Sequence, residues 1–254
     1  MINKKDSEFD INDFFSKSKI EKKKYIFQEA KKIATPKSLH PNLLDAYQNK
    51  EVINKFIKDY IDLKNNTDDQ IKEEIKNKID EFKNDYLNNK ISKKIFSKKA
   101  SLFSMIGAEI FKSAQTISKG LSTSMGSLWE KIASCSNTVI NTEEEFGIKI
   151  TGIDAISIIE KKITYIQLKT AEDTLTAGHS PRSVMELSIH DNAIFGAAFK
   201  TGSKWHFKSE KINKYAGKDF WDLIGLDYDF IYEQSKTMIL EIERKYVELR
   251  DAKN

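Results

Sequence analysis

Apolar residues recur every three to four positions through much of the first hundred residues, which is the spacing of one helix face. The pattern is clear in residues 51–63 and again in residues 70–87. The polar sequence KNNTDDQ separates the two segments, and Thr67 or Asp68 within it is suited to cap the second helix. The two segments predict an antiparallel helical pair, so we expect residues 1–100 to form a helical N-terminal region.

The period shortens to two after Thr142, which indicates extended strands. Residues 146–159 (FGIKITGIDAISII) alternate, a charged turn follows at 160–162, and residues 163–170 (ITYIQLKT) are again strand-like, so this segment predicts a β-hairpin. The pattern predicts a helix over 102–119 that breaks at GLSTSMG and restarts at 127–134 with a cap near Ser124. After the hairpin it predicts a short helix at 180–191 with Pro181 in its first turn, strands at 192–199 and 204–212, and a helix from 232 onward.

The order of predicted elements after residue 100 is helix, hairpin, helix, strand, strand, helix. Such an alternation is typical of an α/β domain built around a mixed sheet with flanking helices. We therefore predict two regions, the helical region at 1–100 and an α/β domain at 101–254.

Composition is that of a globular protein: 39% of the 254 residues are hydrophobic and 31% are charged. No apolar run approaches the ~20 residues of a transmembrane helix, and the N-terminus lacks the apolar core of a secretory signal, so we expect no membrane association. The single cysteine, Cys135, fits a reducing cytoplasm and excludes a cysteine-based zinc site.

Positive charge is concentrated in the first region. Residues 1–100 hold 23 lysines against 17 acidic residues, which gives +6, while the whole chain is +4. The segment 89–100 has five lysines and no acid, which indicates either a solvated helix face or contact with phosphates.

Two polar residues interrupt the second strand of the hairpin. Gln167 and Lys169 are two residues apart, so a strand directs both to one face, where burial without partners would be costly. If the hairpin turn has an even number of residues, Asp154 on the first strand lies opposite Gln167 or Lys169 and the three groups satisfy one another.

This set permits two interpretations. The first is a cross-strand Asp–Lys pair that only stabilises the hairpin. The second is a catalytic site, because carboxylate and amide oxygens are ligands that suit Mg²⁺ and a neighbouring ammonium can bind a phosphate or hold an attacking water. Since the metal also neutralises charge that develops on phosphorus, the set is suited to phosphodiester hydrolysis.

The sequence GID-x(12)-QLK, formed by residues 152–154 and 167–169, resembles the PD-(D/E)XK nuclease motif. It departs from that motif at Ile153, where proline is usual, and at Gln167, where an acid is usual. The glutamine variant also occurs in the family, notably in methylation-dependent restriction nucleases. The lost negative charge should weaken metal binding unless another acid helps, and the resemblance implies one on the preceding helix. Glu130 is the first choice and Glu109 the second.

A second resemblance covers residues 120–225 in patches. The sequence NKYAGKDFWDLIG (213–225) is similar to a segment of type II restriction endonucleases that cut GGNCC-type sites, in which the helix MGSLWEKI and the hairpin occur in the same order. From the residues alone, Phe220 and Trp221 are core aromatics that anchor a short helix.

Together the resemblances imply a PD-(D/E)XK-like core and a Mg²⁺-dependent type II restriction endonuclease. In that interpretation Asp154 and Glu130 bind the metal with the Gln167 side-chain oxygen and the Leu168 carbonyl, and Lys169 orients the water and stabilises the charged phosphorane. The expected partners are double-stranded DNA, a second copy of the chain, because a cutter of both strands needs two active sites, and a cognate DNA methyltransferase encoded nearby.

The loop after the hairpin, TAEDTLTAGHSPRSVMELS, is the expected DNA-reading segment because it starts at the site and is rich in hydroxyl groups. Arginine is scarce in this chain and can read guanine in the major groove. The candidate DNA-binding residues are Arg182, Ser180, Thr174, Thr176, His179 and Lys204. For each of them the alternative is an ordinary loop residue that does not contact DNA.

Other functions remain open or are excluded on sequence. A methylation-dependent or less specific nuclease on the same fold, and a non-catalytic DNA-binding or interaction module, are the alternatives. The four histidines show no zinc-ligand spacing and the chain has no P-loop, which argues against a histidine–metal nuclease and against ATP-driven restriction.

Overall fold

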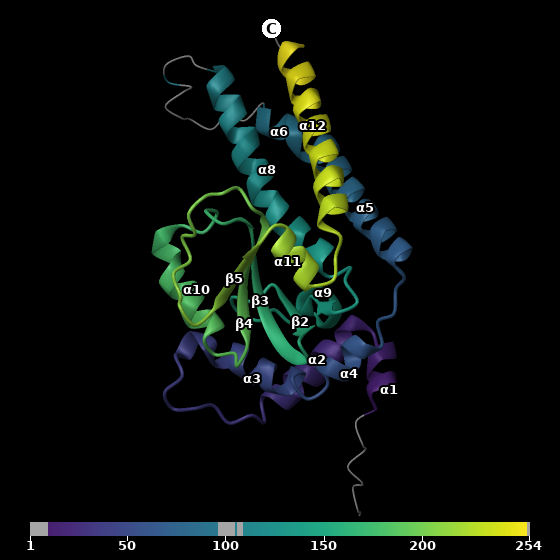
Figure 1. Ribbon diagram of the computed structural model, residues 1–254, viewed down its shortest axis with the longest axis vertical. Helices are drawn as coiled ribbons and strands as arrows, with labels where there is room; N and C mark the ends of the chain where they lie inside the picture. The colour runs from purple at the N-terminus through teal and green to yellow at the C-terminus, as the bar shows by residue number, and fades with distance from the viewer. Residues whose placement is uncertain (1–9, 96–104, 106–108, 253–254) are drawn as a thin grey trace, which may run out of the picture.

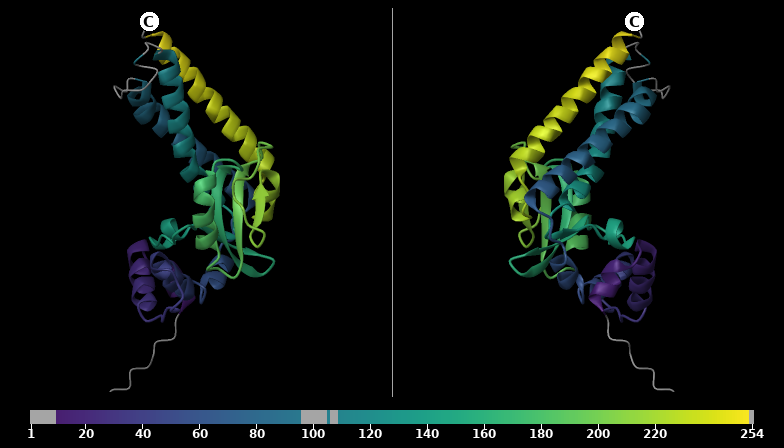
Figure 2. Two further views of the ribbon diagram at one scale, coloured as in Figure 1. Left: turned by 90° about the vertical axis from the view of Figure 1, so that its left-hand side faces the viewer. Right: turned by 90° about the vertical axis from the view of Figure 1, so that its right-hand side faces the viewer.

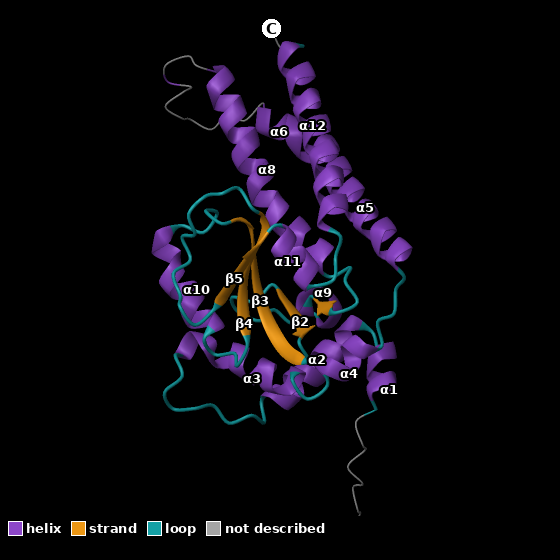
Figure 3. Cartoon of the chain, in the orientation of Figure 1, coloured by secondary structure: helices purple, strands orange, loops and turns teal. Residues whose placement is uncertain are grey.

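A five-stranded mixed β-sheet with helices on both faces forms the centre of the computed structural model, which describes residues 10–95, 105 and 109–252 (Figures 1 and 3). The strands lie in chain order: β1 (Val139–Ile140), β2 (Ala155–Ile159), β3 (Lys162–Ala171), β4 (Ala193–Phe199) and β5 (Asn213–Ala216). Pairs β1–β2 and β2–β3 are antiparallel, whereas β3–β4 and β4–β5 are parallel. The predicted α/β class is therefore confirmed, as is the helical character of the N-terminal region.

Helices account for most of the remaining chain. Those before the sheet are α1 (Ile11–Ser16), α2 (Lys19–Ala30), η1 (Pro41–Leu43), α3 (Leu44–Ile53), α4 (Ile57–Asp62), α5 (Asp68–Asp85), the π-helical η2 (Tyr86–Lys90), α6 (Ile91–Ile95) and α8 (Glu109–Ala133). Those within and after it are α9 (Thr142–Phe146), η3 (Ala177–His179), α10 (Ser180–Leu187), α11 (Lys218–Leu223) and α12 (Tyr228–Asp251). None of the helices in the described part of the chain combines the length and apolar character needed to cross a membrane.

The sheet separates two hydrophobic clusters. One face of β3 contributes Ile166 and Leu168 to a cluster with α5, α8, α11 and α12, which we call the α8-side cluster. The other face contributes Tyr165 to a cluster with α1, α2, α3, α4 and α9, which we call the α3-side cluster. Figures 1 and 2 show α8 and α12 extending beyond one end of the sheet, with α1–α4 gathered at the other end. By alternation along β3, Gln167 and Lys169 belong to the same face as Tyr165.

The hairpin is confirmed, and its turn has the even length that aligns Asp154 with the polar pair. Ile159 pairs with Lys162, so only Glu160 and Lys161 form the turn, and both have positive φ as in a type I′ turn. The register continues to the pair Ala155–Ile166, which places Asp154 next to Gln167 at the following position. The short helix α10, strand β4 and helix α12 are also confirmed.

The predicted break in the helix before the sheet is wrong. Helix α8 runs unbroken through Gly120 and Gly126, since a helical glycine costs only about 1 kcal/mol. Burial of one apolar stripe outweighs that cost, and the stripe includes Met125, Leu128 and Trp129. The beginning of the helix predicted at 102–119, and much of the lysine segment at 89–100, lie outside the described residues.

The first part of one predicted strand and the whole of another are also wrong. Residues 146–154 are not extended, because Asn141 caps α9 by accepting from the N–H groups of Glu143 and Glu144, and Gly147 ends that helix at φ 65°. Ile148 and Ile150 are nevertheless buried, so their alternation reflects packing of a loop. Residues 204–212 form a loop as well, and the edge strand β5 begins only at Asn213.

The expected antiparallel helical pair does not form. Helix α4 places Ile57 and Ile61 in the α3-side cluster, whereas α5 places Ile71 and Ile75 in the α8-side cluster. Each amphipathic helix buries its stripe against a different face of the α/β core. Periodicity identified the helices but not their partners.

His190 makes stability sensitive to acid. It is 6% exposed, stacks on Tyr165 at 3.8 Å between ring centroids, and neither ring nitrogen has a hydrogen-bond partner among the described residues. Burial, with a contribution from Lys50, lowers the pKa of His190 to about 3. Since the unfolded chain takes up this proton below pH ~6.5 and the folded chain does not, this contribution to stability is complete above pH ~6.5 and is lost as the pH falls towards 3.

We therefore expect wild type to lose about 2 kcal/mol more stability than His190→Phe between pH 7 and pH 5, at about 1.4 kcal/mol per pH unit below 6.5. Urea unfolding at both pH values measures the difference. His179→Phe, at an exposed histidine, is the matched control and should follow wild type. Equal losses in wild type and His190→Phe would show that His190 titrates normally in the fold.

Candidate metal and phosphate site

Asp154 lies against strand β3 at the centre of the candidate site. Its backbone N–H donates to the Ile166 carbonyl at 2.8 Å, and its Oδ2 accepts from the Leu168 N–H at 2.7 Å. Lys169 Nζ is 3.7 Å from the same oxygen. The side chains of Asp154 and Lys169 remain 18% and 27% exposed, so both can be reached from solvent.

The turn before Asp154 is shaped by glycine and by α10. Gly152 has φ +77°, and a Cβ built there would lie 2.4 Å from Glu186 Oε2 and 2.5 Å from Glu186 Cβ. Only glycine fits both the backbone conformation and the space. Glu186 is buried, and its Oε1 accepts from Arg182 Nε at 2.7 Å, which holds the carboxylate in place beside the turn.

Gln167 is buried beside Asp154 with an unsatisfied oxygen. Its side chain is 6% exposed, and Oε1 accepts no hydrogen bond from any described residue. A buried amide oxygen without a donor is unfavourable by about 1–3 kcal/mol, so a water or a cation bound at this atom would be favourable.

Glu130 of α8 lies within electrostatic reach of the hairpin. The pKa of Glu130 is raised to about 7, mainly by burial and also by the charge of Asp154, while Lys169 and Lys149 oppose the shift. Burial also raises the pKa of Asp154, against the effects of Lys169 and of the Leu168 N–H. The two carboxylates are therefore close enough to act on each other, and burial raises the pKa of both.

Glu109 does not belong to this site. It is the first residue of α8, 21 positions before Glu130. At 1.5 Å per residue the two positions are about 30 Å apart along the helix axis. Of the two acids considered on sequence, Glu130 is the one that the fold brings to Asp154 and Lys169.

The donor set fits a divalent cation such as Mg²⁺. Two carboxylates and one unpaired amide oxygen are hard oxygen ligands, and a cation among them would satisfy Gln167 Oε1 and relieve the repulsion between Asp154 and Glu130. Among the residues that the structure describes, no three His, Cys, Asp or Glu side chains gather to hold a metal ion. The third protein oxygen would therefore have to come from an amide or a backbone carbonyl.

The sequence did not single out Lys149. It lies in the loop before Asp154 with a side chain 75% exposed, 3.6 Å from Glu143 Oε2, and its charge acts on both Asp154 and Glu130. The one available signal was a lysine within the otherwise apolar alternation of residues 148–153.

The loops after β3 and β4, together with the first residues of α10, are joined into one surface, which we call the two-loop surface (residues 172–182 and 200–208). Glu172 Oε2 accepts from the Thr201 N–H at 2.9 Å and from its hydroxyl at 3.0 Å. His206 hydrogen-bonds to the Leu175 carbonyl at 2.8 Å, and the Lys208 N–H donates to Ser180 Oγ at 2.9 Å. The surface begins three residues after Lys169.

The candidate DNA-binding residues divide into two groups on this surface. Ser180 is buried and Thr174 Oγ1 accepts from the Ala171 N–H, so these hydroxyls serve the local fold. Four candidates are solvent-exposed: Arg182, with 71% of its side chain accessible, Lys204, and the hydrogen-bonded pair Thr176 and His179.

The aromatic residues near the site are structural, as the residue pattern indicated. Trp129 is buried and its Nε1 donates to Thr170 Oγ1 at 3.2 Å, which fixes α8 against β3. Phe220 and Trp221 are buried in α11, and Trp221 Nε1 donates to the Ala198 carbonyl at 2.8 Å.

Comparison of the chain with family models, with curated proteins and with solved structures gives no match in any of the three.

Proposed function

We propose that this protein is a Mg²⁺-dependent type II restriction endonuclease that hydrolyses phosphodiester bonds of double-stranded DNA at a specific short palindromic site. One observation carries the proposal: Asp154, Gln167 and Lys169 converge on one hairpin, with Glu130 of the preceding helix in electrostatic reach. The mixed sheet, with its hairpin preceded by a helix, is compatible with a PD-(D/E)XK core.

Each side chain has a separate role in this proposal. Asp154, Glu130 and Gln167 Oε1 would hold Mg²⁺, with the Leu168 carbonyl as a further ligand. Bound there, the ion would supply positive charge against the phosphoryl oxygens. Lys169 holds the attacking water and stabilises negative charge on the phosphorane, because its ammonium lies at the same carboxylate.

The two-loop surface is the proposed place of sequence reading. It adjoins the catalytic strand and presents Arg182, Lys204, Thr176 and His179 to solvent. In the free protein Arg182 keeps its Nε on Glu186, which leaves the terminal guanidinium nitrogens for a guanine edge or a phosphate. Cleavage of both strands calls for a homodimer, and a host that carries such an enzyme requires a cognate methyltransferase.

The proposal is tested with purified full-length protein on unmodified and cytosine-methylated plasmid DNA, with Mg²⁺ or with EDTA. A discrete fragment pattern from unmodified DNA, dependent on Mg²⁺ and with one sequence at the mapped ends, is the expected result. The Gln167 variant favours a second candidate, a methylation-dependent nuclease, which would cut only the methylated plasmid. If no divalent metal supports cleavage of either DNA although the protein binds DNA, the non-catalytic module is correct.

Lys149→Ala should weaken DNA binding without abolishing cleavage. Its exposed ammonium lies at the rim of the site, where it can contact one phosphate. We expect the dissociation constant to rise about 3–10-fold at physiological salt and the slope of log K against log[salt] to fall by about 1. Fluorescence anisotropy in Ca²⁺ or EDTA measures both quantities. Lys162→Ala, an exposed lysine at the far end of β3, should change neither, and a Lys149 variant with the wild-type salt slope would exclude a phosphate contact.

A further inference from the structure

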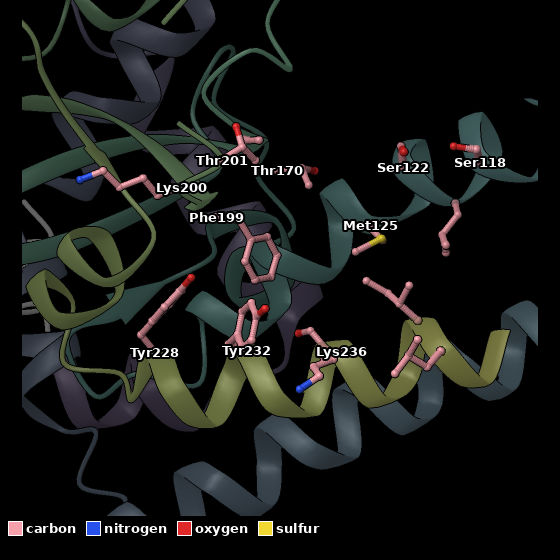
Figure 4. A pocket seen from close by; sticks show the side chains of 15 residues that line it. Ser118, Ser122, Met125, Thr170, Phe199, Lys200, Thr201, Tyr228, Tyr232 and Lys236 are labelled. Atoms are coloured by element: carbon pink, nitrogen blue, oxygen red, sulfur yellow. The ribbon is translucent and has the colours of Figure 1, made fainter. Parts of the chain in front are cut away.

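Helices α8 and α12 diverge above the end of β3 and leave an apolar groove of about 560 Å³ between them (Figure 4). Its walls include Leu121 and Met125 from α8 and Tyr228 and Tyr232 from α12, and Phe199 forms part of its floor. The groove lies in the α8-side cluster, on the opposite face of the sheet from Lys169 but at the same end of β3, since Thr170 and Ala171 also line it.

Helix α12 carries a second apolar stripe that nothing in the described chain covers. Its first stripe, with Ile231, Met238 and Ile242, is buried in the α8-side cluster. The second stripe consists of residues that are each at least 37% exposed: Tyr232, Ile239, Leu240 and Val247. Tyr232 and Ile239 are seven positions apart, as are Leu240 and Val247, so they form one continuous line along the helix. The line borders the groove and continues beyond it.

A polar atom within the groove is also unsatisfied. Ser235 is 2% exposed and lines the groove, yet its Oγ has no hydrogen-bond partner among the described residues. An apolar groove, an uncovered apolar line and an unpaired buried hydroxyl at one place are characteristic of a surface that another chain covers.

We propose that a second copy of this chain docks here, with the exposed line of each α12 lying in the α8–α12 groove of its partner. Such a contact is self-complementary about a two-fold axis, because each copy offers the same line and the same groove. The need for two active sites comes from the proposed function, and to that extent the proposal rests on it. The groove and the exposed line are independent of that function.

The size of the face suits a stable dimer. Helices α8 and α12 have 25 and 24 residues, so each is about 36 Å long. Two such helices, each ~10 Å wide, present about 700 Å², close to the ~800 Å² that each partner buries in a standard interface. A small ligand would fill the groove but would leave the line out to Val247 uncovered.

The charges beside the line permit self-association. Lys236 lines the groove and pairs with Glu233 at 3.2 Å, and both are more than half exposed. In an antiparallel contact of two α12 helices, Lys236 of each copy can pair with Glu233 of the other copy instead of its own. No like charges then meet without a partner.

The position also suits a cutter of both strands. The groove lies at the end of β3 that carries Lys169, on the opposite face of the sheet, so a two-fold axis through it brings the Lys169 ends of the two β3 strands towards each other. The residue that follows α3, Asn54, contacts the sheet nearer the other end of β3, where Tyr165 Oη donates to Asn54 Oδ1. Tyr165 lies five strand residues, or about 17 Å, from Thr170. A dimer through α1–α4 would separate the two sites.

Sedimentation velocity of the full-length protein, without DNA or metal, tests the proposal. Wild type should sediment at twice the chain mass of 29.3 kDa, that is 58.6 kDa. Leu240→Glu and Ile239→Glu each place a charge on the exposed line and should raise the dimer dissociation constant at least about 30-fold. Both side chains are already solvent-exposed, so circular dichroism should show unchanged folding. Ile20→Glu, at a 79% exposed residue of α2, is the matched control and should remain dimeric.

A wild-type monomer at concentrations on the order of 100 μM would overturn the inference. A dimer that survives both Leu240→Glu and Ile239→Glu, or that only Ile20→Glu dissociates, would overturn it as well. The outcome is separate from that of the proposed function. If Leu240→Glu and Ile239→Glu break the dimer but the protein never cuts DNA, the interface proposed here is retained and the nuclease function is rejected. If the protein is a monomer that cuts DNA, the interface is rejected and the nuclease function is retained.

Discussion

Lys169→Ala is expected to lower the rate of DNA cleavage at least about 10³-fold, because it removes the ammonium placed to stabilise charge on the phosphorane. The fold should be retained, since Lys169 keeps 27% of its side chain exposed and its ion pair with Asp154 is as long as 3.7 Å. The rate is measured as single-turnover cleavage of supercoiled plasmid in excess Mg²⁺. Binding to the same DNA in EDTA should change less than about tenfold, because a single phosphate contact is lost.

Lys162→Ala provides the matched control. Lys162 lies on the same strand, seven residues and about 23 Å away, and is exposed, so the two variants make the same charge change at different ends of β3. It should cut at the wild-type rate. If Lys169→Ala cuts as fast as Lys162→Ala, the site proposed here does not catalyse the reaction, and any cleavage comes from elsewhere.

Gly152→Ala is expected to destabilise the protein by about 2–4 kcal/mol and to displace Asp154. The residue has φ +77°, which a Cβ makes unfavourable, and that Cβ would lie 2.5 Å from Glu186 Cβ, an atom fixed on helix α10. Either the turn before Asp154 or α10 must therefore move. Chemical denaturation measures the loss, and cleavage assays below the unfolding transition should show a reduced rate as well.

Gly126→Ala is the counterpart in which the same substitution should stabilise the protein. Gly126 lies within α8, and a Cβ there would meet no described atom within 4 Å. Alanine in a helix should add about 0.5–1 kcal/mol. If Gly152→Ala kept or raised the unfolding midpoint, the local conformation assigned to Gly152 would be wrong.

The hairpin shows how far sequence reasoning reached. Strand alternation placed Gln167 and Lys169 on one face, and the requirement that polar groups satisfy one another selected an even turn. Both follow from local rules, the period of a strand and the cost of burying polar atoms, and need no knowledge of the rest of the chain.

Local rules failed where tertiary packing overrode them. Gly120 and Gly126 suggested a break in α8, but burial against β3 outweighs their cost. Ile148 and Ile150 suggested a strand, but they anchor a loop between α9 and Asp154. Lys149 was missed because its importance depends on being near Glu130 and Asp154 in space.

The sequence by itself therefore determined the α/β class, the hairpin and the polar face it presents, because these depend on neighbouring residues along one or two strands. Only the tertiary structure decided that Glu130 and not Glu109 meets Asp154, that α4 and α5 lie in different hydrophobic clusters, and that α8 and α12 leave an apolar line and groove uncovered. These are contacts between segments far apart in the chain, and they are set by which apolar surfaces bury one another, a choice that periodicity along the sequence leaves open.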